Sequence, residues 1–176
     1  MRISCKARRR WNLAALACAV LVAPLGGGCG YSVRAPFTHE VKTVYVPLFR
    51  SISFRREVQL QLSELVIKEI ERRTPYKVVG SPEGADTVLD GTINLADKNI
   101  VLENPFNYPR QLTATITVNV SWNHNPPTPE DLDRGPTLVS EVVNFVPEIG
   151  ESSETAFYRA NQLVARQIVD MMEAPW

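Results

Sequence analysis

Residues 112–122 run Leu-Thr-Ala-Thr-Ile-Thr-Val-Asn-Val-Ser-Trp, and this stretch has the clearest pattern in the chain. Apolar side chains alternate with Thr, Asn and Ser at all eleven positions. Successive side chains of a strand point to opposite faces of its sheet. Period two therefore predicts a strand with one face in a core and the other face in water.

Two segments on either side of this strand have helical periodicity. In residues 54–73 the apolar side chains fall within about a third of the helical circumference; they are Phe54, Val58, Leu62, Leu65 and Val66. Thr74-Pro75 ends this helix, because the residue before a proline avoids helical geometry. A second helix is predicted over about 154–172, with a cap at Ser152 or Ser153.

β-branched or alternating segments predict the other strands, which are 41–47, 76–80, 87–102 and 137–146. A strand, a helix and a strand in succession favour a crossover with parallel strands. Residues 123–136 hold four prolines and predict a hairpin loop with no helix or strand interior. The order predicts an α+β fold: a two-layer sandwich with two helices packed on one face of a mixed, mostly antiparallel sheet.

The formal charge of zero over 176 residues hides an asymmetry. Residues 1–28 hold five basic side chains and no acidic one, so the remaining 148 residues carry a net charge of −5. An acidic body argues against nonspecific nucleic-acid binding, which needs a basic surface. That length suits one domain, and a hydrophobic content of 44% excludes wholesale disorder.

The basic start and short apolar run of residues 1–28 predict a secretory signal peptide, which is removed. Gly26-Gly27-Gly28 directly before Cys29 resembles the lipobox of bacterial lipoproteins. That resemblance implies a diacylglycerol on the thiol of Cys29 and an acyl chain, such as palmitate, on its amino group. Two alternatives are an ordinary cleavage site nearby, with Cys29 as a spare thiol, and a retained membrane anchor.

The cysteine count agrees with lipidation. Of Cys5, Cys18 and Cys29, only the last would remain in the mature chain. A thioether to lipid removes the reactive thiol that an exported protein would otherwise carry. Gly30, in place of the Asp that usually retains lipoproteins in the inner membrane, favours the outer membrane. The predicted organisation is a signal peptide at 1–28, a lipidated tether at 29–40 and a single domain at 41–176.

The order of several motifs resembles the LPS-assembly lipoprotein family LptE. Cys29-Gly30-Tyr31-Ser32-Val33-Arg34 is similar to the lipidated start of that family. The Val-Tyr-Val-Pro strand at 44–47, the helix end and strand at 69–79, and Leu-Asp-Gly-Thr-Ile at 89–93 follow in the family's order. The resemblance covers nearly the whole mature chain, and the proline loop stands out as an insertion.

This resemblance implies a lipid-anchored protein at the periplasmic side of the outer membrane. Such proteins plug the LptD-type β-barrel, support its assembly, and form with it the translocon that carries lipopolysaccharide to the outer leaflet. They can bind lipopolysaccharide and are not enzymes. An alternative is a stand-alone lipoprotein that binds another envelope partner or ligand through the same sandwich.

Leu60 and Ile67 lie on the side of the first helix opposite Val58 and Leu62. One interpretation is that a loop covers this side. The other is an apolar contact with the wall of the barrel.

Arg110 begins the clearest strand and Lys98 lies on the preceding one, so a hairpin could bring both cations to a lipid phosphate. The alternative for this pair is ordinary solvated surface charge. Residues 104–109 form the tip of that hairpin, whose aromatic side chains suit acyl chains, the barrel or local packing.

Catalytic and metal chemistry find no support in the residues. His39 falls in the tether and His124 in the proline loop, so neither is placed on a rigid element near a nucleophile. No nucleophile-elbow, zincin or phosphate-loop motif is present. Two histidines without partners do not predict a metal site. The sequence therefore predicts no enzyme, no bound cofactor and no metal.

Overall fold

The computed structural model describes Phe37 and residues 40–106 and 108–173. All of these belong to the second of two compact units, which spans residues 35–176. The predicted signal peptide, Cys29 and most of the predicted tether lie outside the described residues.

The described part of the chain contains six strands and two long helices. The strands are β1 (Thr43–Tyr45), β2 (Arg50–Ser51), β3 (Lys77–Val79), β4 (Thr87–Glu103), β5 (Pro109–His124) and β6 (Thr137–Phe145). The long helices are α2 (Arg56–Arg73) and α4 (Ser153–Asp170), and the short ones are α3 (Pro129–Asp133) and the 3₁₀ turn η2 (Pro147–Ile149).

One sheet joins all six strands in the order β3-β1-β4-β5-β6, with β2 also paired to β4. β4, β5 and β6 are antiparallel to one another. β1 pairs in parallel with β3, which confirms the crossover predicted from the strand, helix and strand at residues 41–80. The predicted mixed, mostly antiparallel sheet is therefore confirmed.

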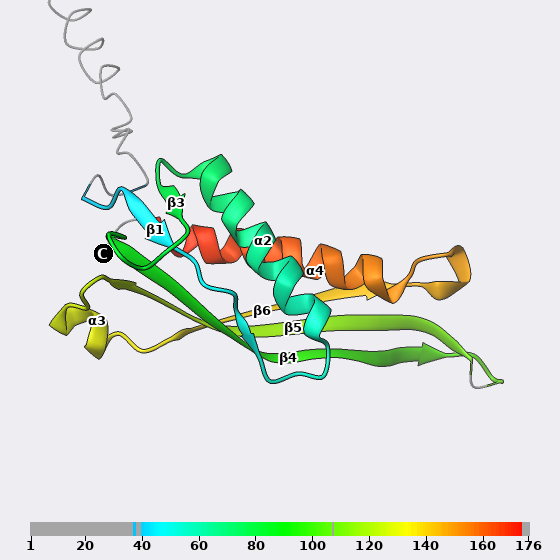
Figure 1. Cartoon of the computed structure of the whole chain (residues 1–176). Helices are drawn as coiled ribbons and strands as arrows, with labels where there is room; N and C mark the ends of the chain where they lie inside the picture. The colour runs from blue at the N-terminus through cyan, green and yellow to red at the C-terminus, as the bar shows by residue number, and fades with distance from the viewer. Residues whose placement is uncertain (1–36, 38–39, 107, 174–176) are drawn as a thin grey trace, which may run out of the picture. The chain divides into compact units, whose positions relative to one another are not determined.

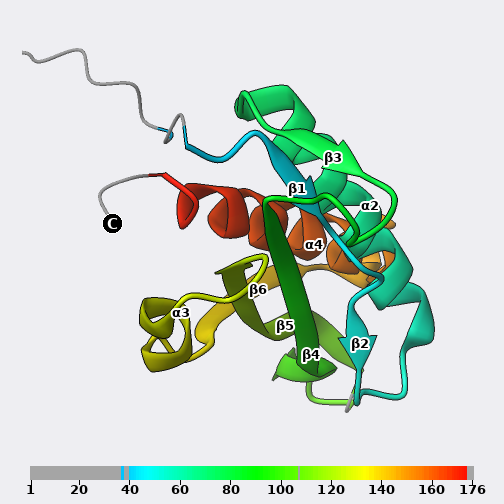
Figure 2. The ribbon, with the colours of Figure 1, turned by 60° about the vertical axis from the view of Figure 1, so that its left-hand side comes forward.

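Both long helices pack on one face of the sheet, as predicted (Figures 1 and 2). They run in the same direction: Asn161 of α4 contacts Val58 near the start of α2, and Asp170 contacts Arg73 at its end. Their buried stripes meet the inward side chains of β4 and β5, which form one core. Its largest fully buried members include Phe49, Leu62, Ile70, Leu89, Ile93, Ile116 and Ile168.

Three local predictions need correction. Phe54 was predicted in the core stripe of the first helix, but the helix begins only at Arg56 and Phe54 is fully exposed. The loop at 123–136 contains the short helix α3, since Pro129 occupies its first turn, where no amide hydrogen bond is needed. The two-residue strand β2 was missed because a strand that short has no readable alternation.

The β4–β5 hairpin extends past the ends of the helices (Figure 1). The 17 residues of β4 span about 55 Å at about 3.3 Å each. The 18 residues of α4 span only about 27 Å at 1.5 Å each. In β4, alternate residues are buried from Thr87 to Ile93, where the register shifts; Ala96 is the last buried residue, and residues 97–103 are all exposed. The helices are too short to cover the distal part of the hairpin.

Candidate functional site

Exposed apolar side chains gather at this distal end of the unit. We call them the hairpin tip; they are Ile100, Val101, Leu102, Phe106 and Tyr108. Ile149 of η2 is also exposed and lies nearby, because the neighbouring Glu148 forms an ion pair with Arg110 of the hairpin. Phe106 is 79% exposed and Ile149 is 75% exposed. Exposed apolar side chains that gather at one end of a monomer indicate a surface for a partner or for lipid.

The side chain of Asn104 builds the turn that presents the aromatic residues. Its Oδ1 accepts hydrogen bonds from the amides of Phe106 at 2.9 Å and Tyr108 at 3.0 Å. The amide of Asn104 donates to the carbonyl of Tyr108 at 3.0 Å. Asn closes such turns because its side chain reaches the backbone two residues on. These three hydrogen bonds hold the turn, and the rings of Phe106 and Tyr108 are exposed on it.

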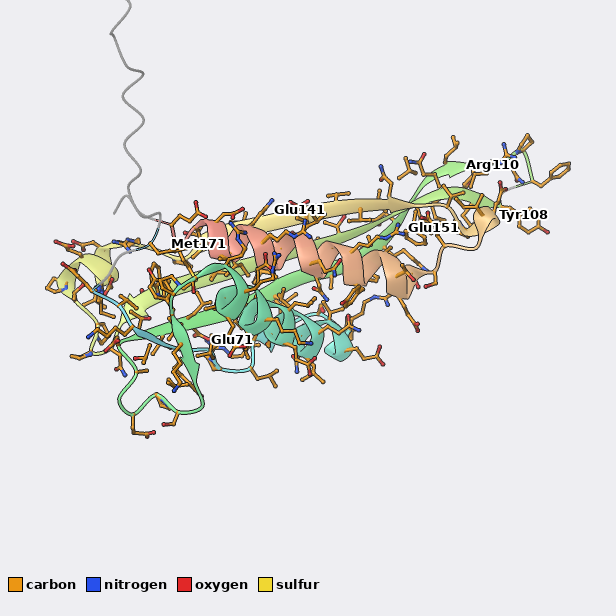
Figure 3. The ribbon with its side chains drawn as sticks, turned by 90° about the horizontal axis from the view of Figure 1, so that it is seen from above. Glu71, Tyr108, Arg110, Glu141, Glu151 and Met171 are labelled. Carbon is orange, nitrogen blue, oxygen red and sulfur yellow. The ribbon has the colours of Figure 1, made fainter. Side chains whose placement is uncertain are left out.

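Arg110 and Lys98 both belong to this hairpin, but the structure does not bring them together. Lys98 lies opposite Ala114 in the register of β4 and β5, four residues from Arg110. That spacing is about 13 Å along the strand, on the same face. The Nε of Arg110 instead lies 3.2 Å from Oε1 of Glu148, and both side chains are about half exposed. Figure 3 places Arg110 and Tyr108 at the same end of the unit.

The face of the sheet away from α2 and α4 is the outer face, and its centre is hydroxylic. Thr113, Thr115 and Thr117 are half-buried, and Oγ1 of Thr117 lies 2.9 Å from Oγ of Ser140. Leu138 and Val142 of β6 pair with Asn119 and Thr115, so they share this face and are exposed there. The outer face thus offers mixed polar and apolar contacts to a neighbouring wall.

Leu60 and Ile67 differ in their surroundings. Leu60 is 55% exposed. Ile67 is half-buried and packs against the core. Only Leu60 is therefore freely available to a partner.

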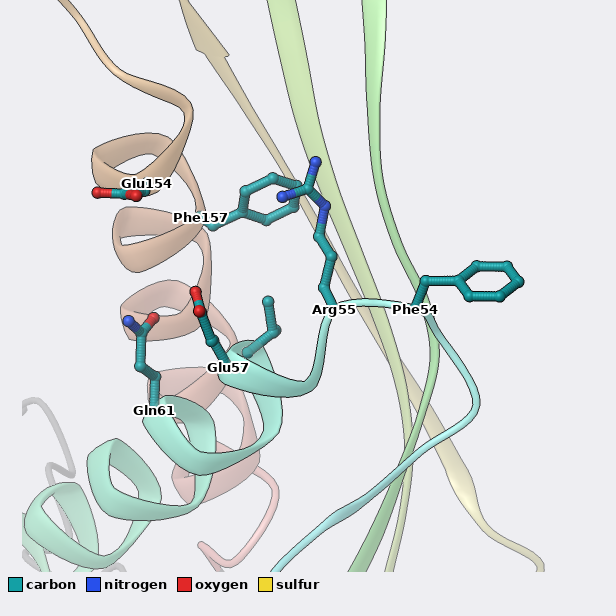
Figure 4. A pocket seen from close by; sticks show the side chains of 7 residues that line it. Phe54, Arg55, Glu57, Gln61, Glu154 and Phe157 are labelled. Carbon is teal, nitrogen blue, oxygen red and sulfur yellow. The ribbon is translucent and has the colours of Figure 1, made fainter.

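A cleft of about 390 Å³ separates the first turns of α2 and α4 (Figure 4). The guanidinium of Arg55 stacks over the ring of Phe157, 4.6 Å from its centroid. Glu57 and Glu154 lie in the first turns of the two helices, where the dipole favours acids. Phe54 also lines the cleft, at its edge, and its ring points away from Phe157 and Glu154 (Figure 4). These contacts are those of a helix junction, so the cleft is accounted for without a ligand.

The proline loop is held by a buried carboxylate. Asp131 accepts hydrogen bonds from the amides of Thr128 at 2.9 Å and His124 at 3.0 Å, and from both side chains. Burial alone would raise the pKa of Asp131, but these hydrogen bonds outweigh it and hold the pKa well below its usual range. His124 thus closes a loop, which gives it a structural role.

Two general properties of the described residues bear on the function. No helix among them combines the length and the apolar character needed to cross a bilayer. Among them, no three His, Cys, Asp or Glu side chains gather as metal ligands would.

The solved structures that share this fold include two with a TM-score of 0.50. A dodecamer of a single-residue variant of PelC from Paraburkholderia phytofirmans is 8% identical, with a TM-score of 0.50 over 79% of this chain and 94% of that one. The rare lipoprotein B from Shewanella oneidensis is 11% identical, with a TM-score of 0.50 over 74% of this chain and 93% of that one. At such low identity these matches establish similarity of fold alone.

Sequence comparison is more specific. No curated protein matches the chain significantly. The family model described as LptE, lipopolysaccharide-assembly, matches residues 41–172. This range covers every helix and strand described above. The chain therefore belongs to the LptE family of non-catalytic lipoproteins, which take part in lipopolysaccharide assembly in the cell envelope.

Proposed function

We propose that this lipoprotein plugs an LptD-type β-barrel of the outer membrane and supports its assembly. In that complex it takes part in carrying lipopolysaccharide to the outer leaflet and binds the glycolipid. It is anchored on the periplasmic side through the lipids on Cys29. The observation that carries this proposal is the exposed apolar hairpin tip, on a domain whose family assembles lipopolysaccharide.

The length of the sheet supports a plug that reaches across the membrane. Phe37 packs against Tyr76 at the end of the domain where β1 pairs with the start of β4. The eight residues from Cys29 to Phe37 extend at most about 28 Å. From that end β4 reaches about 55 Å to the hairpin tip, whereas a bilayer with its headgroups is about 40–45 Å thick. A domain held upright in a barrel would bring its tip to the level of the outer leaflet.

The outer face and the two cations complete the proposed contacts. A wide barrel has a polar lumen, and the Thr-, Ser- and Asn-rich outer face suits such a wall. Arg110 and Lys98 lie near the tip, where lipopolysaccharide phosphates would pass. Because the two side chains are separated along the hairpin, each would contact a different phosphate or a different partner group.

Polar substitution of the hairpin tip should release the barrel. The variant Leu102→Ser/Phe106→Ser/Tyr108→Ser should recover about tenfold less barrel from detergent-solubilised membranes, because it removes the apolar anchors of the interface. Its melting temperature should stay close to that of the unchanged protein, since these side chains are exposed. Co-purification followed by thermal unfolding measures both.

The matched control is Leu132→Ser, which removes an exposed leucine from α3, near the opposite end of the domain. It should leave barrel recovery unchanged. If no large β-barrel accompanies the unchanged protein, the plug proposal fails and the stand-alone lipoprotein becomes the better explanation.

A separate prediction concerns the contact of Leu60 and Ile67 of α2 with the barrel wall. Leu60→Glu should reduce barrel recovery with little change in melting temperature, because Leu60 is exposed. Ile67→Glu should lower the melting temperature, because it places a charge against the core. The same thermal unfolding measures both variants. A lower melting temperature for Leu60→Glu would show that this side of α2 packs inside the domain.

A further inference from the structure

The solvent-facing groove between α2 and α4 carries a cluster of cations. A space of about 210 Å³ lies between the two helices and is lined by Leu65, Lys68, Glu69, Arg72, Gln162, Ala165 and Arg166. It lies far from the hairpin tip, on the helical layer whose two helices are seen side by side in Figure 3.

The two helices each supply a row of donors to this groove. Lys68 and Arg72 are four residues apart on α2, and Gln162 and Arg166 are four residues apart on α4. Side chains at this spacing point to the same side of a helix. Because the helices run in the same direction, both rows face the same space. Ala165 is small and buried, so the helices leave room between them.

The internal ion pairs of this region leave part of its positive charge uncompensated. Oε1 of Glu69 lies 2.6 Å from a guanidinium nitrogen of Arg72, and a second guanidinium, that of Arg73, lies 3.6 Å from the same oxygen. Within the described residues, Lys68 and Arg166 have no ion-pair partner.

The net charge of the groove follows from the residues that line it. Three cations and one carboxylate line it, which gives a net charge of +2. The chain beyond residue 28 carries −5, so this is a local exception. A phosphate monoester carries about −1.5 to −2 at pH 7 and has three strong acceptor oxygens. The lysine, the guanidinium of Arg166 and the amide of Gln162 are donors that such an anion needs. Arg72 already donates to Glu69 through two of its nitrogens and adds its positive charge and its remaining N–H groups.

We propose that this groove binds a phosphate monoester, held between Lys68 and Arg72 of α2 and Arg166 of α4. Its source is the phosphorylated sugar of an envelope glycolipid; this choice of source rests on the proposed function, whereas the site itself does not. The groove is distinct from the hairpin tip, so the protein would contact phosphates at two places.

The first experiment uses α-D-glucose 1-phosphate as the probe, with glucose as the uncharged control. The lipidated chain in detergent should show shifts in the NMR signals of Gln162 and Arg166 on titration with the phosphate and not with glucose. Affinity should rise between pH 5 and 7, because the second ionisation of the phosphate has a pKa of about 6. Lys68→Gln/Arg166→Gln should weaken binding by about tenfold or more.

The matched control removes two exposed lysines elsewhere, in Lys42→Gln/Lys77→Gln. It should bind the probe as the unchanged protein does. Equal weakening in both double variants would overturn the proposal, because the effect would then belong to overall charge. Absence of any shift with glucose 1-phosphate would also overturn it.

The second experiment identifies the source with purified lipopolysaccharide and its dephosphorylated form. If the groove variant weakens binding of the phosphorylated form alone, the glycolipid source is supported. If glucose 1-phosphate needs the groove but lipopolysaccharide does not, the site stands and the glycolipid source is overturned. A loss seen only in Lys98→Gln/Arg110→Gln would support the lipid contact of the proposed function and overturn the groove as its glycolipid site.

Discussion

Gly91→Ala should lower the free energy of unfolding by about 2 kcal/mol, although it adds only one methyl group. A Cβ at Gly91 would lie 2.6 Å from Cε2 of Phe49 and 2.7 Å from its Cδ2. The ring cannot swing away, because Phe49 is 1% exposed and its amide donates to Oγ of Ser63 at 3.0 Å. The strand β4 must instead shift away from the ring. Urea unfolding of the purified chain measures the loss.

A double-mutant cycle assigns this loss to one contact. In a Phe49→Leu background the ring is gone, so Gly91→Ala should cost clearly less there, with a coupling of about 1 kcal/mol or more. Gly80→Ala is the control, because nothing lies within 4 Å of a Cβ at that position. Additive effects of the two substitutions would show that the close approach of the ring to Gly91 is not the cause.

Asp131→Asn should destabilise the proline loop by about 2 kcal/mol at neutral pH, because an amide oxygen replaces a carboxylate that accepts charge-assisted hydrogen bonds. The pKa of Asp131 is lowered by folding. Its contribution is therefore complete above the unfolded value of about 3.9 and is lost as the pH falls through the folded value. Hydrogen exchange at the amides of Thr128 and His124 measures the opening of this loop.

The amide protection of the unchanged chain and of Asp131→Asn should therefore become similar at acidic pH. The unchanged chain should lose protection at these amides as the pH drops below about 4, while Asp131→Asn should change less over the same range. A difference that grows toward low pH would contradict the ionised carboxylate as the stabilising form. His124→Leu is the companion variant, since leucine has no side-chain donor for Asp131 and the carboxylate stays in place.

The strongest sequence patterns predicted the frame of the fold correctly. The alternation at 112–122 identified a strand with one buried and one open face, and the structure shows both. The strand, helix and strand at 41–80 predicted the parallel pair of β1 and β3. The family resemblance, based on the order of short motifs, is confirmed over residues 41–172.

The errors lie where local periodicity has little information. Phe54 has the right spacing for the core stripe, but the helix starts after it, and the start depends on tertiary contacts. Helix α3 was missed because four prolines argued against regular structure, while the capping box of Thr128 and Asp131 allows one turn of helix.

By itself, the sequence determined the two long helices, the five longer strands and the apolar face of most of them, and the order of its motifs indicated the family. The helices, strands and apolar faces follow from the spacing of residues close in the chain, because side-chain direction repeats every two or 3.6 residues. Only the tertiary structure decided which apolar and charged side chains remain open. The hairpin tip is exposed because a strand rises more than twice as far per residue as a helix. Lys68 and Arg166 share a groove because packing places α2 beside α4, and no local pattern specifies that pairing.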